Sequence, residues 1–128
     1  MFHDKHYVST KLALYSSDLQ TVLIMRYPKR AISGLPGGHV DRGETPDDAI
    51  VRELMEELSI TVDNMKRVDF FYNNRIILAY TAIAPADIVI TPTDPKYEYA
   101  EWVAKDDIQT TKMAPEYIRF ILQNWPKF

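Results

Sequence analysis

A helix start near residue 45 constrains the fold more than any other feature of this sequence. Thr45 is a favourable N-cap residue, and Pro46 suits the first helical position because its missing N–H would have no partner there. Asp47 and Asp48 then place negative charge at the positive end of the helix dipole. We therefore predict a helix that begins after Thr45 and runs to about Leu58. Such a helix needs a second layer against which it buries its apolar side.

The predicted helix has one apolar face and one strongly acidic face. At about 100° per residue, Glu53, Glu56 and Glu57 together span only about 100° of its circumference. The residues expected to face the core lie on the opposite side: Val51, Leu54 and Leu58. Crowded carboxylates raise one another's pKa unless a cation compensates them, and Mg²⁺ or Mn²⁺ prefers such oxygen ligands. A solvated acidic face is the alternative interpretation, and it is the common fate of a charge run.

Apolar patterns elsewhere predict strands on both sides of this helix in the sequence. The predicted strands are 7–15, 21–27, 66–72, 75–84, 88–91 and 97–104. In the first of them, the residues expected to share one half-buried face are Val8, Thr10, Leu12 and Leu14. Asn73 and Asn74 are turn residues between two of the strands, and Pro115 opens a last helix. The order strands, helix, strands, helix predicts an α/β fold with a mixed sheet covered by helices.

Length and composition set limits on the class of protein. A chain of 128 residues with 46% apolar residues is expected to form one domain, residues 1–128, with a real core. The net charge of -3 favours neither a nucleic-acid polymer nor a membrane surface as partner. The chain has no cysteine, which excludes disulfides and cysteine-ligated zinc. No secretory signal or membrane span is predicted, so we expect a cytoplasmic protein.

A glycine-rich loop precedes the helix. Gly37 and Gly38 permit backbone conformations that bring a carbonyl or amide close to a ligand, although an ordinary turn would explain them equally. Together with the acidic face they predict a site for a metal ion and phosphate. The cationic residues that could meet substrate phosphates, or belong to a solvated loop, are Arg26, Lys29, Arg30 and Arg75.

Residues 38–60 resemble the box that defines the Nudix hydrolase family. Eight of its nine fixed positions match in order and spacing: Gly38, Glu44, Arg52, Glu53, Leu54, Glu56, Glu57 and Ile60. Ser59 stands where the family has glycine. Because that glycine ends the helix in a left-handed conformation, Ser59 is expected to shift the helix end or to carry strain of about 1 kcal/mol. The preceding LPGG and the later EYAEWVAKDDI also resemble the family, so the similarity covers most of the chain.

The resemblance implies a Nudix fold, an α/β/α sandwich on a mixed sheet, in which the box forms loop, helix and loop. It also implies Mg²⁺-dependent or Mn²⁺-dependent hydrolysis of a nucleoside diphosphate linked to another group. By analogy with the family, the metal ligands would be the carboxylates of Glu53, Glu56 and Glu57 and the carbonyl of Gly37. Glu44 and Arg52 would orient these ligands through hydrogen bonds and ion pairs.

The identity of the general base stays open at this level. Glu53 or Glu57 could accept the proton of the attacking water, and so could a glutamate from a later segment. Family members often place such a glutamate shortly before a Trp-Val pair. With side chains alternating along strand 97–104, Glu98 fits that position better than Glu101.

Several functions remain compatible with the resemblance. A MutT-like nucleoside triphosphate pyrophosphohydrolase that releases a nucleoside monophosphate is favoured, with ADP-sugar and dinucleotide polyphosphate hydrolases still open. The alternative is a non-catalytic nucleotide or nucleotide-sugar sensor, although such modules usually lose box glutamates. An isopentenyl-diphosphate isomerase is disfavoured because the chain lacks cysteine. Either a monomer or a homodimer is possible.

Overall fold

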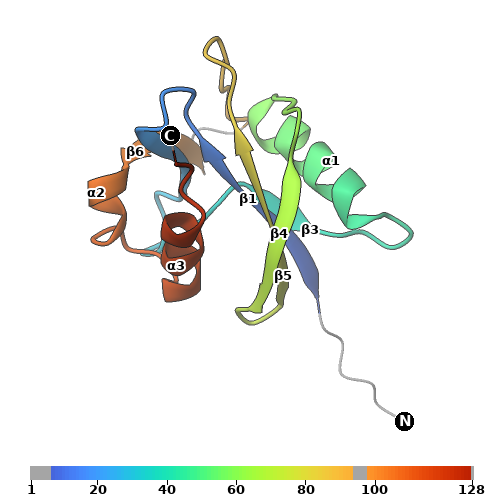
Figure 1. Cartoon of the computed structure of the whole chain (residues 1–128). Helices are drawn as coiled ribbons and strands as arrows, with labels where there is room; N and C mark the ends of the chain where they lie inside the picture. Colours follow the sequence, from blue (N-terminus) through green and yellow to red (C-terminus); the bar gives the residue numbers. More distant parts are fainter. Residues whose placement is uncertain (1–6, 94–97, 128) are drawn as a thin grey trace.

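The computed structural model describes residues 7–93 and 98–127 and shows a central sheet flanked by helices (Figure 1). The strands are β1 (Val8–Tyr15), β2 (Thr21–Arg26), β3 (Gly37–His39), β4 (Lys66–Tyr72), β5 (Ile76–Ile83) and β6 (Tyr99–Ala104). The helices are α1 (Pro46–Leu58), α2 (Lys105–Ile108) and α3 (Pro115–Gln123).

The sheet is mixed and has β1 at its centre. Its order is β4-β5-β1-β2-β6, and β3 pairs with β1 off this path. β1 and β5 run parallel along their whole length, whereas the other pairs are antiparallel. Helix α1 covers one face of the sheet, and α3 lies on the other side (Figure 1). The predicted α/β/α architecture is therefore confirmed.

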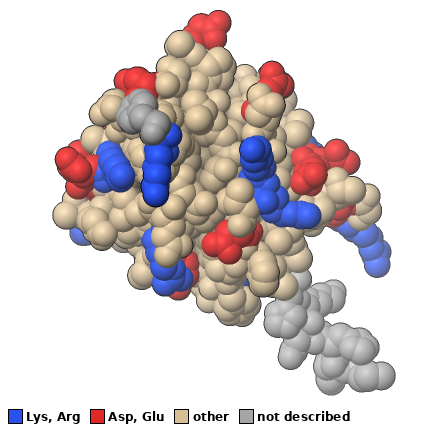
Figure 2. All heavy atoms as spheres, in the orientation of Figure 1, with Lys and Arg blue, Asp and Glu red and all other residues tan. Residues whose placement is uncertain are grey.

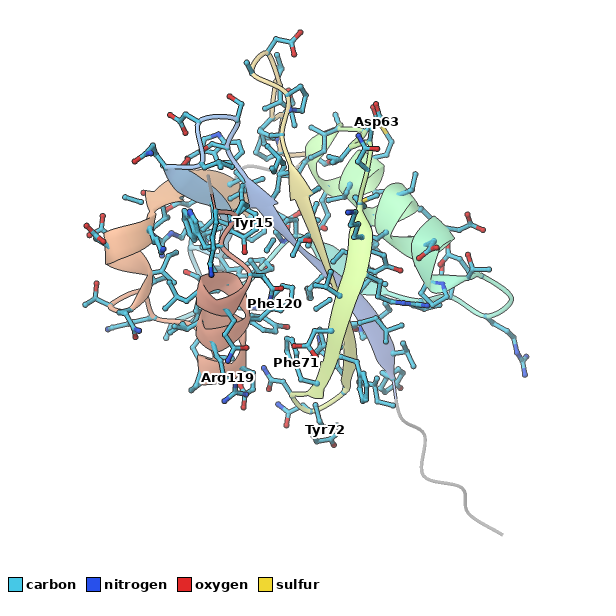
Figure 3. All side chains as sticks on the ribbon, viewed as in Figure 1. Tyr15, Asp63, Phe71, Tyr72, Arg119 and Phe120 are labelled. Atoms are coloured by element: carbon cyan, nitrogen blue, oxygen red, sulfur yellow. The ribbon has the colours of Figure 1, made fainter. Side chains whose placement is uncertain are left out.

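Strand β1 is buried on both faces, so the prediction of a half-buried strand was wrong. Leu12 and Leu14 pack in the core beneath α1, while Ala13 and Tyr15 pack in the core beneath α3. The Tyr15 hydroxyl donates to the Ile121 carbonyl at 2.8 Å, and the ring of Phe120 lies nearby in the same layer (Figure 3). A central strand between two helical layers leaves neither face to solvent.

Helix α1 begins and ends where the sequence predicts. The Thr45 side chain accepts a hydrogen bond from the Asp48 N–H at 3.1 Å, which confirms the N-cap. The core-facing side was predicted about one residue out of phase: Ile50 is buried with Leu54 and Leu58, whereas Val51 is exposed. At the other end, Ser59 itself adopts the left-handed conformation, with φ of 55°. The helix end is not shifted, so the serine carries the strain.

Other predictions need smaller corrections. Residues 88–91 form no strand, and the short elements β3 and α2 were not predicted. The turn between β4 and β5 is confirmed, with Asn74 at φ of 58°. Of the predicted strand 97–104, Tyr97 lies outside the described residues, and β6 begins at Tyr99.

Charge is spread over the part of the molecule that the structure describes. On the face seen in Figure 2, basic and acidic side chains are interspersed, and neither sign forms a continuous surface. Within the described ranges, none of the helices has the length and apolar character that crossing a bilayer would require. The charge clusters that follow are therefore local features of the fold.

Candidate active site

Arg52 is the centre of an ion-pair network on α1. Its guanidinium contacts Glu44 through two nitrogens, Nε at 2.7 Å and Nη2 at 3.0 Å. Its Nη1 donates to Glu53 at 3.0 Å and to Glu56 at 3.1 Å, and its Nη2 also reaches the carbonyl of His39. The hydrogen bonds from Arg52 lower the pKa of Glu44 to about 2. Arg52 therefore fixes the direction of two of the predicted metal ligands and joins α1 to the preceding loop.

Glu57 occupies a different environment, half-buried against the sheet. Its Oε1 accepts a hydrogen bond from the backbone N–H of Gly37 at 2.8 Å. Burial raises the pKa of Glu57 to about 7; the Gly37 N–H and the charge of Lys11 oppose this rise, and Glu98 and Glu53 add to it. Its negative charge is therefore only partly compensated by the protein, which is the condition in which a carboxylate gains most from a bound cation.

The two glycines at the start of β3 act in different ways. Gly37 has φ of 135°, and a side chain there would overlap the carbonyl oxygen of Thr10 on the paired strand β1. A Cβ on Gly38 would stand 2.5 Å from the carboxylate carbon of Glu53. Gly37 therefore lets β3 pair with β1, and Gly38 leaves the space that the Glu53 carboxylate occupies.

The structure separates the two glutamates near β6. Glu101 forms an exposed ion pair with Arg26 at 2.9 Å. Glu98 lies near the box instead, since its charge raises the pKa of Glu57 and counteracts the effect of burial on the pKa of Lys11. Of the two candidate later glutamates, the structure brings only Glu98 to the acidic cluster.

Lys11 is a site residue that sequence reasoning missed. It is buried in the centre of β1, where it pairs with Gly37 across the sheet. Burial lowers the pKa of Lys11, while the charges of Glu57, Glu53 and Glu98 act in the opposite direction. The available signal was a lysine inside a strand whose neighbours are largely apolar.

Lys11 also lines a cavity of about 540 Å³ next to the acidic cluster. Besides Lys11, the lining side chains that matter here are Tyr27, Arg30, Asn73, Arg75 and Tyr117. Glu57 and Glu98 both raise the pKa of Tyr27, which places the cavity wall close to these carboxylates. The cavity therefore lies close to the acidic cluster of α1.

The donor set fits a hard divalent cation. The candidate ligands are all oxygens, and Glu57 carries a half-buried charge with incomplete compensation. Within residues 7–93 and 98–127, no three acidic or imidazole side chains converge on one point as they stand. Glu53 and Glu56 face Arg52, and Glu57 faces Gly37. Ion binding therefore requires these carboxylates to exchange part of their present hydrogen bonding.

Comparison with known proteins places the chain among nucleotide-processing enzymes. The sequence model of the family described as NUDIX domain matches residues 5–123. The mouse oxidized purine nucleoside triphosphate hydrolase is 29% identical over 117 residues, which cover 79% of this chain and 75% of that protein. The 8-oxo-dGTP diphosphatase of Haemophilus influenzae is 49% identical over 45 residues, 33% of each chain.

Solved structures show the same fold. One, from a study of MutT proteins of Aliivibrio salmonicida and Vibrio cholerae, superposes with a TM-score of 0.78 at 20% identity. The match covers 93% of this chain and 98% of that one. The arrangement of sheet and helices is thus shared over nearly the whole length of both.

Proposed function

Because this chain belongs to the Nudix family and is a MutT-like pyrophosphohydrolase, we propose that it hydrolyses, with Mg²⁺ bound, nucleoside diphosphates linked to another group. The observation that carries the proposal is the half-buried Glu57, held by the Gly37 N–H beside the Glu53 and Glu98 carboxylates. Such a concentration of negative charge serves a reaction that needs a bound cation.

The proposed metal ligands are Glu53, Glu56, Glu57 and the carbonyl of Gly37. When bound there, Mg²⁺, or Mn²⁺ in its place, supplies neutralisation of the diphosphate oxygens and activation of water. Arg52 fixes the orientation of the Glu53 and Glu56 carboxylates through hydrogen bonds. Glu44 in turn fixes the orientation of Arg52 by accepting two hydrogen bonds from its guanidinium. This support is needed because freely rotating glutamates would not keep one coordination geometry.

We assign proton transfer to Glu98. Glu98 directly precedes the edge strand β6, and its charge acts on Glu57. A carboxylate next to other carboxylates is a stronger base than an isolated one, which suits removal of a proton from the attacking water. Glu57 and Glu53 then keep their role as ligands.

The first substrate class to test is the nucleoside triphosphates, with a nucleoside monophosphate as product. The mouse relative is named for hydrolysis of oxidized purine nucleoside triphosphates, and the alignment with it covers most of both chains. A cytoplasmic location, a single domain over residues 1–128, and a monomeric or dimeric state remain predictions from the sequence.

The decisive experiment incubates the protein and Mg²⁺ with a panel of nucleoside triphosphates, nucleotide-sugars and dinucleotides, and measures released phosphate and pyrophosphate. Glu57→Gln and Glu98→Gln should each lower kcat by about a hundredfold or more on the best substrate. Glu101→Gln is the matched control, because Glu101 lies in β6, close to Glu98 in the sequence, but pairs with Arg26. Full activity of Glu57→Gln would contradict the assignment. Tight binding of one compound without turnover of any would support the sensor alternative instead.

A further inference from the structure

The last turn of α1 combines three features that disfavour the end of a helix. Glu56 and Glu57 place negative charge at the terminus where the helix dipole is already negative, and this turn contains no basic residue. Ser59 then adopts the left-handed conformation that glycine accepts at lower cost. The two carboxylates belong to the proposed metal site, so the turn needs stabilising contacts from elsewhere in the fold.

These contacts come from residues 91–93, which donate hydrogen bonds to the end of the helix. The last four carbonyls of a helix have no partner within it, and here the first of them accepts from the residue directly after α1. Of the other three, the Leu58 carbonyl accepts from the Thr91 N–H at 3.0 Å. Thr93 supplies both remaining donors: its N–H binds the Glu57 carbonyl at 2.9 Å, and its hydroxyl binds the Glu56 carbonyl. The end of α1 is therefore fully hydrogen-bonded, and Thr93 contacts the backbone of both proposed ligands.

The segment that contains Thr93 also leads to Glu98. Because the sheet order is β4-β5-β1-β2-β6, the connection from β5 to β6 has to pass both β1 and β2. Ile88 and Ile90 in this connection pack against the core beneath α1, so the connection crosses on the α1 side of the sheet. Glu98 lies between Thr93 and β6, and its charge raises the pKa of Glu57. One connection thus binds the end of α1 and contains the residue to which we assign proton transfer.

We propose that Thr93 is a positioning residue: it holds the last turn of α1 so that the Glu56 and Glu57 carboxylates keep a fixed orientation toward Glu98. Thr93 contacts only the backbone of these residues and is itself neither a ligand nor a base. The Glu57 carboxylate accepts from the Gly37 N–H at 2.8 Å, and this contact depends on the turn staying in place. The role rests on the proposed function, because it matters only for a reaction in which these carboxylates act together.

Amide hydrogen exchange measured by NMR tests the position of Glu57 without metal or turnover. Thr93→Val keeps the shape of the side chain and the N–H but removes the hydroxyl, and because Thr93 is exposed the core stays unchanged. In this variant the Gly37 amide should exchange about tenfold faster, since Glu57 holds it less firmly. The Leu12 amide, which donates to the Pro36 carbonyl, is the internal reference and should change less than about twofold. Equal changes at both amides, or none at Gly37, would overturn the positioning role.

Steady-state kinetics with Mg²⁺ and the best nucleotide measure the effect on the reaction. Thr93→Val should lower kcat about tenfold and change KM less than about twofold, because Thr93 orients the reacting groups without touching the substrate. Thr93→Ser keeps the hydroxyl and should restore kcat. Thr111→Val is the matched control: the Thr111 hydroxyl donates to the Asp107 carbonyl of α2 at 2.8 Å, so the same kind of bond is lost at a helix outside the site. Its kcat should equal that of the wild type.

The outcomes separate the positioning role from the proposed function. If Glu57→Gln is inactive but Thr93→Val and Thr111→Val both keep the kcat of the wild type, the hydrolase assignment stands and the role of Thr93 is wrong. A fall in kcat that Thr93→Ser does not restore would also overturn the role, since the hydroxyl would not be the cause. If Glu57→Gln remains fully active, the hydrolase assignment fails, while exchange of the Gly37 amide still reports whether Thr93 holds Glu57 in place.

Discussion

Two neighbouring regions of this molecule differ in how their charged side chains are paired. On α1, one arginine is surrounded by carboxylates, and Arg52 with Glu44 forms a network in which each charge has a partner within 3.1 Å. The neighbouring cavity is lined by the cations Lys11, Arg30 and Arg75, and none of the three forms an ion pair within the described residues. In the first region the charges are joined by hydrogen-bonded ion pairs, whereas in the second the cations are held without them. The difference indicates that α1 and the cavity contribute differently to the stability of the fold.

The largest effect on folding is expected where the two regions meet, at Gly37. Gly37 pairs with Lys11 and donates to Glu57, and Gly37→Ala would combine positive φ with overlap on the Thr10 carbonyl. We expect a loss of more than about 3 kcal/mol in the free energy of unfolding, measured by urea denaturation.

Gly43→Ala is the control for this variant. Gly43 also has positive φ, 81°, but a side chain there meets nothing within 4 Å. It should lose only about 1 kcal/mol, the conformational part alone. Equal losses in both variants would show that the close approach of β3 to β1 does not matter.

The next largest effect on stability is expected at Arg52, the centre of the ion-pair network on α1. Arg52→Gln leaves Glu44, whose side chain is only 16% exposed, without its charged partner. The free energy of unfolding should therefore fall, as measured by urea denaturation. Compared with Arg52→Gln, Arg52→Lys should recover part of the stability but little of the activity. An ammonium group cannot make the bidentate contact that the guanidinium makes with Glu44. If Arg52→Lys kept full kcat, the directional role of the network would be wrong.

The pH dependence of stability offers a smaller test of the same network. The pKa of Glu44 is about 2 in the folded protein against an ordinary value of 4.5, mainly because Arg52 donates to it. Its ionised form therefore favours folding: the contribution is complete above pH 4.5 and is lost as the pH falls toward 2. Glu44→Gln should be less stable than the wild type at pH 7, and the gap should shrink between pH 4.5 and 2 in urea denaturation. A gap that is constant over this range would contradict the ion-pair explanation.

The smallest effect on the free energy of unfolding, and one of opposite sign, is expected for a substitution in the cavity. Arg75→Gln removes a cation that repels Lys11 and has no acidic partner among the described residues. Without ligand, the free energy of unfolding should stay the same or rise by a few tenths of a kcal/mol. A clear loss of stability in ligand-free Arg75→Gln would remove the contrast between the two regions.

Features set by local sequence were predictable, and features set by pairing across the fold were not. The N-cap at Thr45 and the acidic face of α1 follow from neighbours within one or two turns of helix. The box residues also came together as their spacing implied, since Arg52 meets Glu44 and Glu56. At Val51 the predicted direction of the core-facing side was wrong. Ile50 and Val51 are adjacent and both apolar, so the sequence pattern does not decide which of them faces the core.

The cavity was beyond prediction because its residues come from separate segments. β3 is a strand only through its pairing with β1, and its short sequence contains two glycines, which favour turns when considered alone. Lys11 is buried because β1 is the centre of the sheet, and this depends on the parallel pairing with β5, which no local pattern specifies. Arg75 reaches the cavity from the turn between β4 and β5, far from Lys11 in the chain.

The most direct test of the central claim is calorimetric titration of Mg²⁺ or Mn²⁺ into the purified protein, with and without a non-hydrolysable nucleotide. If the acidic face of α1 exists to hold a divalent cation for diphosphate hydrolysis, the wild type and Glu101→Gln should show saturable binding of equal strength. Glu57→Gln should bind the ion about tenfold more weakly or worse. Absence of any ion uptake by the wild type, with or without nucleotide, would contradict the account.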